Sequence, residues 1–149
     1  MEIAIANDHA AILLKHDILK YLNEKKNVTA KDFGALENQC CLDYPEYAWE
    51  VCCKVLSGKF DKGILICGTG SGMCIASNKV RGIRAVVCSD PYTARFARAH
   101  NDANILCIGS RVVGCELAKF IVDTFVETSF EGGRHSSRVA KIMDIESKN

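Results

Sequence analysis

The residues with the clearest chemical potential lie between Gly63 and Gly72, which read GILICGTGSG. Residues 64–66 form a short apolar run that is typical of a buried parallel strand, and Cys67 ends it. Three glycines follow at every second position, and glycine permits backbone conformations in which successive N–H groups point toward one site. A thiol beside such donors has the parts needed to act on a carbonyl or a sugar phosphate. The alternative is a buried cysteine followed by a simple glycine turn, and this stretch alone does not separate the two.

The spacing of these glycines excludes three familiar glycine loops. A dinucleotide-binding G-x-G-x-x-G motif needs its third glycine where Met73 stands. A P-loop needs a lysine followed by serine or threonine, and no such pair follows Gly72. A cysteine phosphatase needs an arginine six residues after its cysteine, and that position is again Met73. The functional interpretation therefore predicts an oxyanion or phosphate site of another kind.

Other polar residues with chemical potential lie next to predicted strands and helices. Asp8 and His9 follow the first strand; Asp8 could cap the next helix or orient a sugar hydroxyl, and His9 could donate to a phosphate. His100 ends a predicted helix, with Asn101 beside it. A histidine in that position either caps the helix C-terminus or serves as a general acid and base near neutral pH.

Three arginines are candidates for binding phosphate. Arg134 and Arg138 are four residues apart, so a helix projects them from one face, and two guanidinium groups near a helix N-terminus could hold a phosphate. They could instead form a solvated basic face or pair with acids such as Glu127 and Glu131. Arg111 follows a predicted strand end and is the third candidate.

The composition of the 149 residues gives little direction toward macromolecular partners. Lysine and arginine number 19 against 18 acidic residues, so no nucleic-acid or membrane partner is expected. Met1–Asp8 carry no signal-peptide pattern, and no apolar run approaches the roughly 20 residues that span a bilayer, so we expect a cytoplasmic protein.

Cysteine and histidine usage predicts free thiols and no metal. Nine cysteines are present, an odd number, and several lie in apolar strand-like runs where cysteine behaves as a small hydrophobic residue. No C-x-x-C motif occurs, and the four histidines, His9, His16, His100 and His135, lack the spacing of metal ligands.

Alternating strand-like and helical patterns must position all these residues. Strands are predicted at residues 1–6, 28–33, 63–67, 83–88 and 105–108, and helices at 12–22, 44–56, 73–80, 91–101, 113–128 and about 134–146. This alternation predicts a single doubly wound, Rossmann-like α/β domain over residues 1–149, with a parallel sheet of about five strands and helices on both faces. Ligands bind such sheets beyond the carboxyl ends of the strands. Residues 7–9, 67–69, 89–90 and 109–111 all fall there, which favours the functional interpretation of Cys67.

Taken in order, these stretches closely resemble ribose-5-phosphate isomerases of the B type, within the family shared with galactose-6-phosphate and allose-6-phosphate isomerases. The resemblance extends over nearly the whole chain. The matching segments are NDHA at 7–10, LKH at 14–16, DYP at 43–45, GILICGTGSG at 63–72, NKVRGIRAVVCSDPY at 78–92, HNDAN at 100–104, IGSRVVG at 108–114 and EGGRHSSR at 131–138.

The resemblance implies an aldose–ketose isomerase of the non-oxidative pentose phosphate pathway. It interconverts D-ribose 5-phosphate and D-ribulose 5-phosphate and needs no metal or organic cofactor. Cys67 is then the base that moves a proton between C1 and C2, and His100 opens the furanose ring. The remaining residues are grouped by role: Gly68, Thr69, Gly70, Ser71 and Gly72 stabilise the enediolate oxygen, Asp8, Tyr44 and Asn101 contact sugar hydroxyls, and His9, Arg111, Arg134 and Arg138 hold the phosphate.

The resemblance also implies homodimers, or dimers of dimers, whose active sites are shared between subunits. The C-terminal helix at about 134–146 is then expected to pack on a neighbouring subunit. Some members have serine where this chain has Cys67 and use a nearby carboxylate as base. Here Ser71, Met73 and Cys74 surround the position and offer no acid, which favours cysteine as the base.

Two departures from the family pattern leave the substrate open. Asn7 stands where many members have a small residue or cysteine, and the loop at 35–42 is rich in cysteine; both are expected near the sugar pocket. The alternative function is isomerisation of a six-carbon sugar phosphate, allose or galactose 6-phosphate. A non-catalytic phosphosugar sensor on the same scaffold is a further alternative, but it would not require both Cys67 and His100.

Overall fold

The computed structural model describes residues 1–37 and 42–148, so the adjacent Cys40 and Cys41 lie outside the described residues. Five strands form one parallel sheet in the order β2-β1-β3-β5-β4. The strands are β1 (Glu2–Asn7), β2 (Thr29–Asp32), β3 (Lys62–Cys67), β4 (Ala85–Val87) and β5 (Ile105–Gly109). The helices are α1 (Ile12–Asn23), α2 (Tyr44–Leu56), α3 (Ser71–Ser77), α4 (Pro91–Ala99), α5 (Cys115–Glu127) and α6 (Arg134–Glu146), and a short 3₁₀ turn, η1 (His9–Ala11), precedes α1.

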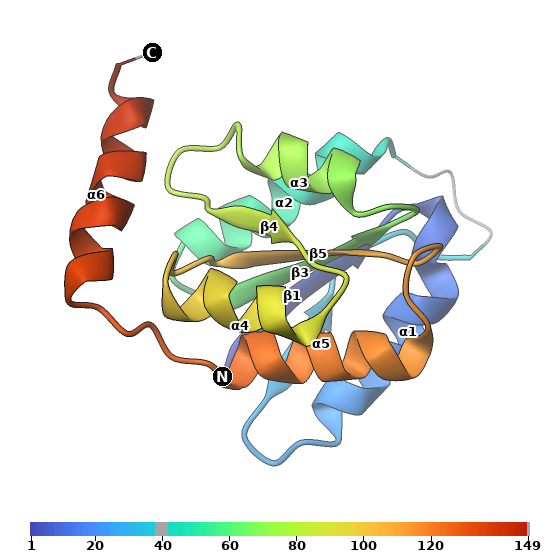
Figure 1. Cartoon of the computed structure of the whole chain (residues 1–149). Coiled ribbons are helices and arrows are strands. Elements are labelled where there is room, and N and C mark those ends of the chain that lie inside the picture. The colour runs from blue at the N-terminus through green and yellow to red at the C-terminus, as the bar shows by residue number, and fades with distance from the viewer. Residues whose placement is uncertain (38–41, 149) are drawn as a thin grey trace.

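Helices cover both faces of the sheet, which confirms the doubly wound α/β prediction (Figure 1). One apolar core lies between the sheet and helices α1, α4 and α5, and it includes Ile5, Ile66 and Phe125. The other lies between the sheet and helices α2 and α3, and it includes Leu65 and Cys67. Because successive strand residues face opposite sides, Ile66 and Cys67 belong to different cores.

The carboxyl ends of β1 and β3 meet where the strand order changes direction. From β1 the chain adds β2 on one side and then returns to place β3 on the other side. Parallel sheets bind ligands at such a switch point. Asp8 and Cys67 come at the ends of these two strands, so the topology places them on the same edge of the sheet.

Local sequence signals explain where the elements begin and end. Helix α2 begins at Tyr44, as predicted, because Asp43 and Glu46 form a capping box in which the Asp43 N–H donates to Glu46 Oε2 at 3.0 Å. Helix α3 begins two residues earlier than predicted and ends three residues earlier. The end follows from Asn78, whose side-chain amide forms hydrogen bonds of 2.8 and 2.9 Å with the backbone of Ala85 on the edge strand β4.

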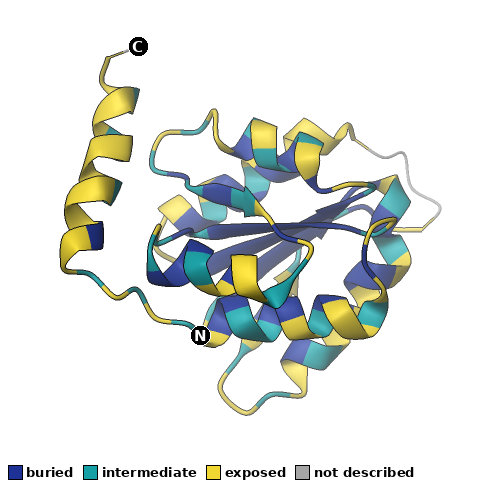
Figure 2. Ribbon diagram, viewed as in Figure 1, coloured by how far each residue is buried: buried dark blue, intermediate teal, exposed yellow. Residues whose placement is uncertain are grey.

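Helix α6 lies apart from the layered body (Figures 1 and 2). His135 is its only buried residue, whereas the sheet and the inner faces of the other helices are buried. Within residues 1–37 and 42–148 no helix has the length and apolar character needed to cross a bilayer. All cysteines in the described part of the chain carry free thiols.

Candidate active site

The loop after β3 holds Cys67 between a rigid strand and a backbone donor. The Cys67 side chain is only 5% exposed, and the Gly70 N–H donates to its sulfur at 3.1 Å. Gly70 has φ of +80°, and a Cβ there would lie 2.8 Å from the Val87 side chain and 3.0 Å from the Ile108 carbonyl carbon. Only glycine fits this turn, so the sequence GTG is what allows the N–H to face the thiol.

The same loop leaves polar groups open to solvent beside the thiol. Thr69 and Ser71 are exposed, whereas Gly68 and Gly72 are half-buried. The loop is held against β5, since a Cβ at Gly109 would lie 2.7 Å from the Thr69 carbonyl carbon. The structure therefore places the residues predicted for the anion site together and leaves one side of the loop accessible.

Arg111 lies over this loop from the end of β5. Its guanidinium is 3.6 to 3.7 Å from the position that a Gly68 Cβ would take, and the backbone N–H of Arg111 donates to the Gly68 carbonyl at 3.0 Å. Arg111 and His9 also line the same surface hollow of about 600 Å³. These two predicted phosphate ligands therefore lie together, next to the Cys67 loop.

Asp8 is buried at the end of β1, where it caps the following turn and is also a candidate for binding a sugar hydroxyl. Its N–H donates to the Ile66 carbonyl at 3.2 Å, which ties it to β3, and one carboxylate oxygen accepts the Ala10 N–H at 2.9 Å. The capping alternative is thus confirmed for that oxygen. The neighbouring Asn7 donates to the Asp8 carbonyl at 2.7 Å, and its own side-chain oxygen has no hydrogen-bond partner among the described residues.

Tyr44 reaches the loop from the first turn of α2. A Cβ at Gly72 would lie 2.9 Å from the Tyr44 ring, so the ring packs directly over this glycine. The Tyr44 side chain is 43% exposed, which leaves its hydroxyl available to a ligand. Tyr44, Asp8, His9, Arg111 and residues 67–72 thus form one group, which we call the carboxyl-edge group.

Cys74 is a thiol that the sequence interpretation did not select. Contact with Cys107 lowers the pKa of Cys74 to about 7, and burial with that same contact raises the pKa of Cys107 well above its ordinary value. The Cys74 sulfur lies on the inner side of α3, where it donates to the Ala85 carbonyl at 3.4 Å. Its orientation toward β4 separates it from the open side of the loop, so Cys67 remains the better candidate base.

The other predicted site residues lie on the opposite side of the sheet from Cys67, at the amino-terminal ends of the parallel strands. His100 and Asn101 follow α4 and precede β5, and Gly63 at the start of β3 donates to the Asn104 carbonyl at 2.9 Å. From Gly63 to Cys67 the strand spans about 13 Å. Within one chain, therefore, His100 does not meet Cys67. Figure 1 shows the end of α4 and the start of α6 together on the side away from the loop that follows β5.

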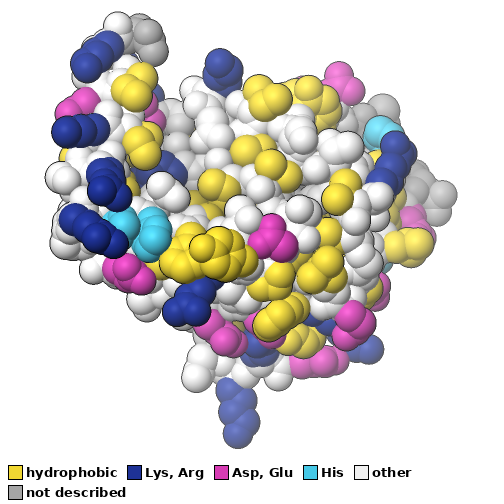
Figure 3. Space-filling view, viewed as in Figure 1, with side chains coloured by type: hydrophobic (Ala, Val, Ile, Leu, Met, Phe, Trp, Pro, Cys, Tyr) yellow, Lys and Arg dark blue, Asp and Glu magenta, His cyan; other side chains and the backbone are white. Residues whose placement is uncertain are grey.

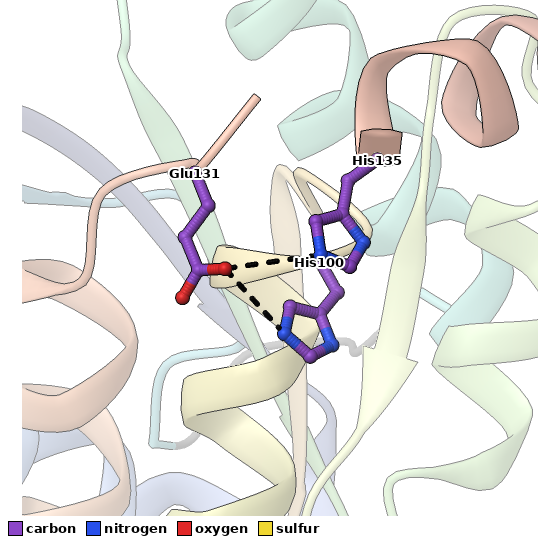
Figure 4. A group of neighbouring side chains, drawn as sticks. All are labelled: His100, Glu131 and His135. Carbon is purple, nitrogen blue, oxygen red and sulfur yellow. Dashed lines mark ion pairs between the residues drawn. The ribbon is translucent and has the colours of Figure 1, made fainter. Parts of the chain in front are cut away.

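His100 stands in a compact cluster with Glu131 and His135 (Figure 4). The two imidazole rings are stacked with centroids 4.1 Å apart and planes within 8°. Both Nε2 atoms face the same carboxylate oxygen of Glu131, at 3.7 Å from His100 and 3.8 Å from His135. The sequence interpretation missed this cluster because these residues are up to 35 positions apart and become neighbours only through the fold.

The cluster has the composition of a metal site, but its surroundings are cationic. His100, Glu131 and His135 each offer a ligand atom, and these atoms lie within 4.8 Å of one another. The histidine spacing along the chain did not indicate this grouping. Arg134 Nε lies 3.5 Å from His135 Nε2, and positive charge from Arg134 and Arg138 acts on the same ring. The two arginines would repel a divalent cation there. The absence of a metal from the site therefore stays a prediction.

Arg134 and Arg138 begin helix α6 beside this cluster. Both are exposed, and neither forms an ion pair with an acidic side chain in the described part of the structure. Glu127 pairs with Lys25 instead, and Glu131 faces the two histidines. Figure 3 shows lysine and arginine side chains gathered along α6 next to the histidines. With His100, Asn101, Glu131 and His135, these arginines form what we call the amino-edge group.

Comparisons with known proteins agree over almost the whole chain. A sequence model of the family described as Ribose/Galactose Isomerase matches residues 3–142. The chain is 51% identical over 147 residues to ribose-5-phosphate isomerase B of Escherichia coli (strain K12), covering 99% of this chain and 97% of that protein. Ribose-5-phosphate isomerase B of Clostridium thermocellum matches the structure with a TM-score of 0.94, 50% identity and 99% coverage of both chains. Ribose-5-phosphate isomerase B of Mycoplasma genitalium, solved with bound ribulose-5-phosphate, matches with a TM-score of 0.92 and 42% identity, covering 99% of this chain and 97% of that one.

Proposed function

Because this chain belongs to the ribose/galactose isomerase family, we propose that it interconverts D-ribose 5-phosphate and D-ribulose 5-phosphate. The observation that carries the proposal is the position of the Cys67 thiol. It lies at the switch point of the sheet and accepts a hydrogen bond from the Gly70 N–H at 3.1 Å. A base and an adjacent oxyanion site are what the reaction requires, since a proton next to a carbonyl is only weakly acidic.

Cys67 moves the proton and the loop stabilises the charge that results. The Cys67 sulfur removes the proton from C2 of the open-chain aldose, and the electron pair moves to O1 to give an enediolate. The hydroxyl proton of O2 passes to O1, and return of the first proton to C1 leaves C2=O and gives the ketose. Backbone N–H groups of residues 68–72, with Thr69 and Ser71, face the developing oxyanion. Donors in other oxyanion holes are worth about 3–4 kcal/mol each. The Gly70 N–H, at the start of α3, donates to the Cys67 sulfur and holds it in place beside the loop.

The sugar and its phosphate are held by residues from both edge groups. We assign Asp8, Tyr44 and Asn101 to the sugar hydroxyls, and His100 to opening of the furanose ring. A larger set of side chains binds the phosphate: His9, Arg111, Arg134 and Arg138. Phosphate is remote from C1 and C2, so these contacts position the substrate without taking part in proton transfer.

A complete site then requires two copies of the chain. The carboxyl-edge group has the base, the amino-edge group has the ring-opening histidine, and one chain holds them at opposite ends of the sheet. A homodimer, or a pair of dimers, resolves this if α6 of one subunit lies on its neighbour. The exposure of α6 supports that arrangement, since Ile142 and Ile145 are 43% and 56% exposed. We place this metal-free enzyme in the cytoplasm, in the non-oxidative pentose phosphate pathway, on the basis of its substrate class.

A direct isomerase assay tests the proposal. Purified protein should convert ribose 5-phosphate to ribulose 5-phosphate at the same rate with and without a chelator. Absence of turnover, or its loss on chelation, would contradict the proposal. The kcat/KM values for ribose 5-phosphate, allose 6-phosphate and galactose 6-phosphate should rank the pentose first; a higher value for either hexose would favour the six-carbon alternative. Tight binding without exchange of the C2 proton into solvent would indicate a sensor.

A further inference from the structure

The contacts of His100 define its ring orientation from three sides. The Phe96 ring lies 4.6 Å from the imidazole, and the His135 ring is stacked on it at 4.1 Å. The Glu131 carboxylate faces the edge of the ring, 3.7 Å from Nε2 (Figure 4). Phe96 comes from α4, Glu131 from the linker before α6, and His135 from α6 itself. Such convergence is typical of a side chain whose orientation matters to its function.

His135 supports the His100 ring by stacking on it, and the Glu131 carboxylate acts on His100. The side chain of His135 is only 6% exposed, whereas that of His100 is 35% exposed. Burial lowers the pKa of His135, and the positive charges of His100, Arg134 and Arg138 lower it further against the opposing effect of Glu131. Of the two rings beside Glu131, the one that a ligand can reach is therefore the more accessible His100.

We propose that Glu131 is the positioning residue for ring opening by His100, a role that rests on the proposed function. The carboxylate holds a proton on Nε2 of His100 and so leaves Nδ1 as the acceptor for the substrate. The linker supports this geometry because the Glu131 N–H donates to the Ala99 carbonyl at 3.0 Å, which ties it to the end of α4. The 3.7 Å separation shortens to a hydrogen bond when the substrate closes the site, as catalytic hydrogen bonds commonly do.

One nitrogen of His100, Nδ1, can both accept and return the proton that ring opening requires. Nδ1 takes the proton of the O1 hydroxyl, the C1–O4 bond breaks with its electron pair moving to O4, and C1=O forms. O4 then receives the proton from Nδ1, so His100 ends the step as it began. O1 and O4 are bonded to the same carbon, which lets one imidazole serve both. The imidazolium formed in between is stabilised by the Glu131 carboxylate, as an aspartate stabilises the histidine of a catalytic triad.

Proton exchange at C1 of ribulose 5-phosphate separates this role from a merely structural one. Ribose 5-phosphate is a closed furanose and must be opened. Ribulose 5-phosphate cannot close a furanose ring, because its O5 carries the phosphate. Exchange of its C1 proton with solvent passes through the enediolate alone, so a residue needed only for ring opening is dispensable for this exchange and needed for turnover of the aldose. General loss of structure would slow both reactions.

The experiment compares Glu131→Gln, Glu131→Ala and His100→Asn with the wild type in two reactions: turnover of ribose 5-phosphate, and exchange of the C1 proton of ribulose 5-phosphate with solvent deuterium. Glu127→Gln is the matched control, since that exposed glutamate lies four residues earlier and pairs with Lys25. For Glu131→Gln we expect kcat/KM for ribose 5-phosphate to fall about 10- to 100-fold, and the rate of C1 exchange to stay within about threefold.

Each outcome decides a different point. If His100→Asn selectively loses turnover of ribose 5-phosphate but Glu131→Gln does not, the role of Glu131 is overturned and the proposed function stands. If Glu131→Gln slows turnover and C1 exchange equally, Glu131 has another role and the inference is wrong. If His100→Asn slows both reactions equally, the assignment of ring opening to His100 fails.

Discussion

At the scale of single residues, the site depends on glycines that bring backbone groups against a thiol. Gly70 has a positive φ and is packed against Val87 and Ile108, so its N–H is aimed at Cys67 by the fold and not by chance. Gly72 gives the Tyr44 ring room to lie over the loop. Any side chain at these positions would displace either the donor or the ring, which is why the motif has glycine there.

Replacing Cys67 tests the assignment of the base. Cys67→Ala should lower kcat by at least about a thousandfold while sugar-phosphate binding, measured by calorimetry, stays within about threefold, since proton abstraction is lost and the binding groups remain. Cys74→Ala is the matched control, because Cys74 has its pKa lowered to about 7 but faces the inner side of α3. Wild-type-like turnover by Cys67→Ala would show that Cys67 is not the base.

At the scale of elements, β3 carries the candidate base, Cys67, at one end and a buried lysine at the other. Lys62 is 8% exposed, and its ammonium donates to the Val126 carbonyl at 3.3 Å. No carboxylate in the described part of the chain lies within ion-pair distance of it. Burial lowers the pKa of Lys62, and the nearby charge of Arg98 adds to this effect. Such a group costs stability, because the charged form has lost water without gaining a counter-ion.

Lys62→Met should therefore stabilise the domain, by about 1 kcal/mol in urea unfolding at neutral pH. The pKa of Lys62 in the folded state is below its ordinary 10.5, so the unfolded chain binds more protons between the two values and wild-type stability rises with pH there. The advantage of Lys62→Met should consequently narrow toward about pH 10. Lys26→Met, at an exposed position, serves as control. A less stable Lys62→Met protein would show that the ammonium is well compensated.

At the scale of the whole molecule, the proposed chemistry is divided between the two edges of one sheet. The carboxyl-edge group has Cys67 and its anion loop, and the amino-edge group has His100, Arg134 and Arg138. The length of β3 keeps them apart within a chain. Helix α6 contacts the body at its start through His135, which stacks on His100, and at its end through Glu146, whose carboxylate accepts the Gly82 N–H at 3.0 Å. Most of its surface is exposed. This arrangement suits a helix that completes a site on another subunit.

Mixing two inactive variants tests whether the site is shared. Cys67→Ala and His100→Asn should each fail to convert ribose 5-phosphate when pure. Refolded together in equal amounts, half of the dimers are mixed and each has one intact site, so about a quarter of wild-type activity should return. Native mass spectrometry of the mixture checks that mixed dimers form. Absence of recovery despite subunit exchange would mean that each chain builds its site alone.

Much of the architecture could be predicted because it is encoded locally. Alternating apolar patterns, the cap at Asp43 and the proline at position 45 define α2, and the run that ends in Cys67 defines β3. The predicted ends of helices and strands are less accurate where side chains form contacts across the fold. Asn78 ends α3 by binding Ala85, and only three residues, Ala85–Val87, pair as β4. Lys15 lies among polar positions in the sequence, yet it is fully buried and bonded to Asp32.

By itself, the sequence determined the α/β class, the family resemblance and the convergence of Asp8, Cys67 and Arg111, since parallel strands place their carboxyl ends on one edge. Only the tertiary structure decided that His100 lies at the other edge of the sheet, and that Glu131 and His135 surround it. The physical reason is distance: caps, turns and hydrophobic periods act over a few neighbouring residues. The meeting of side chains 31 and 35 positions apart depends on how the α4 end and the α6 linker pack together.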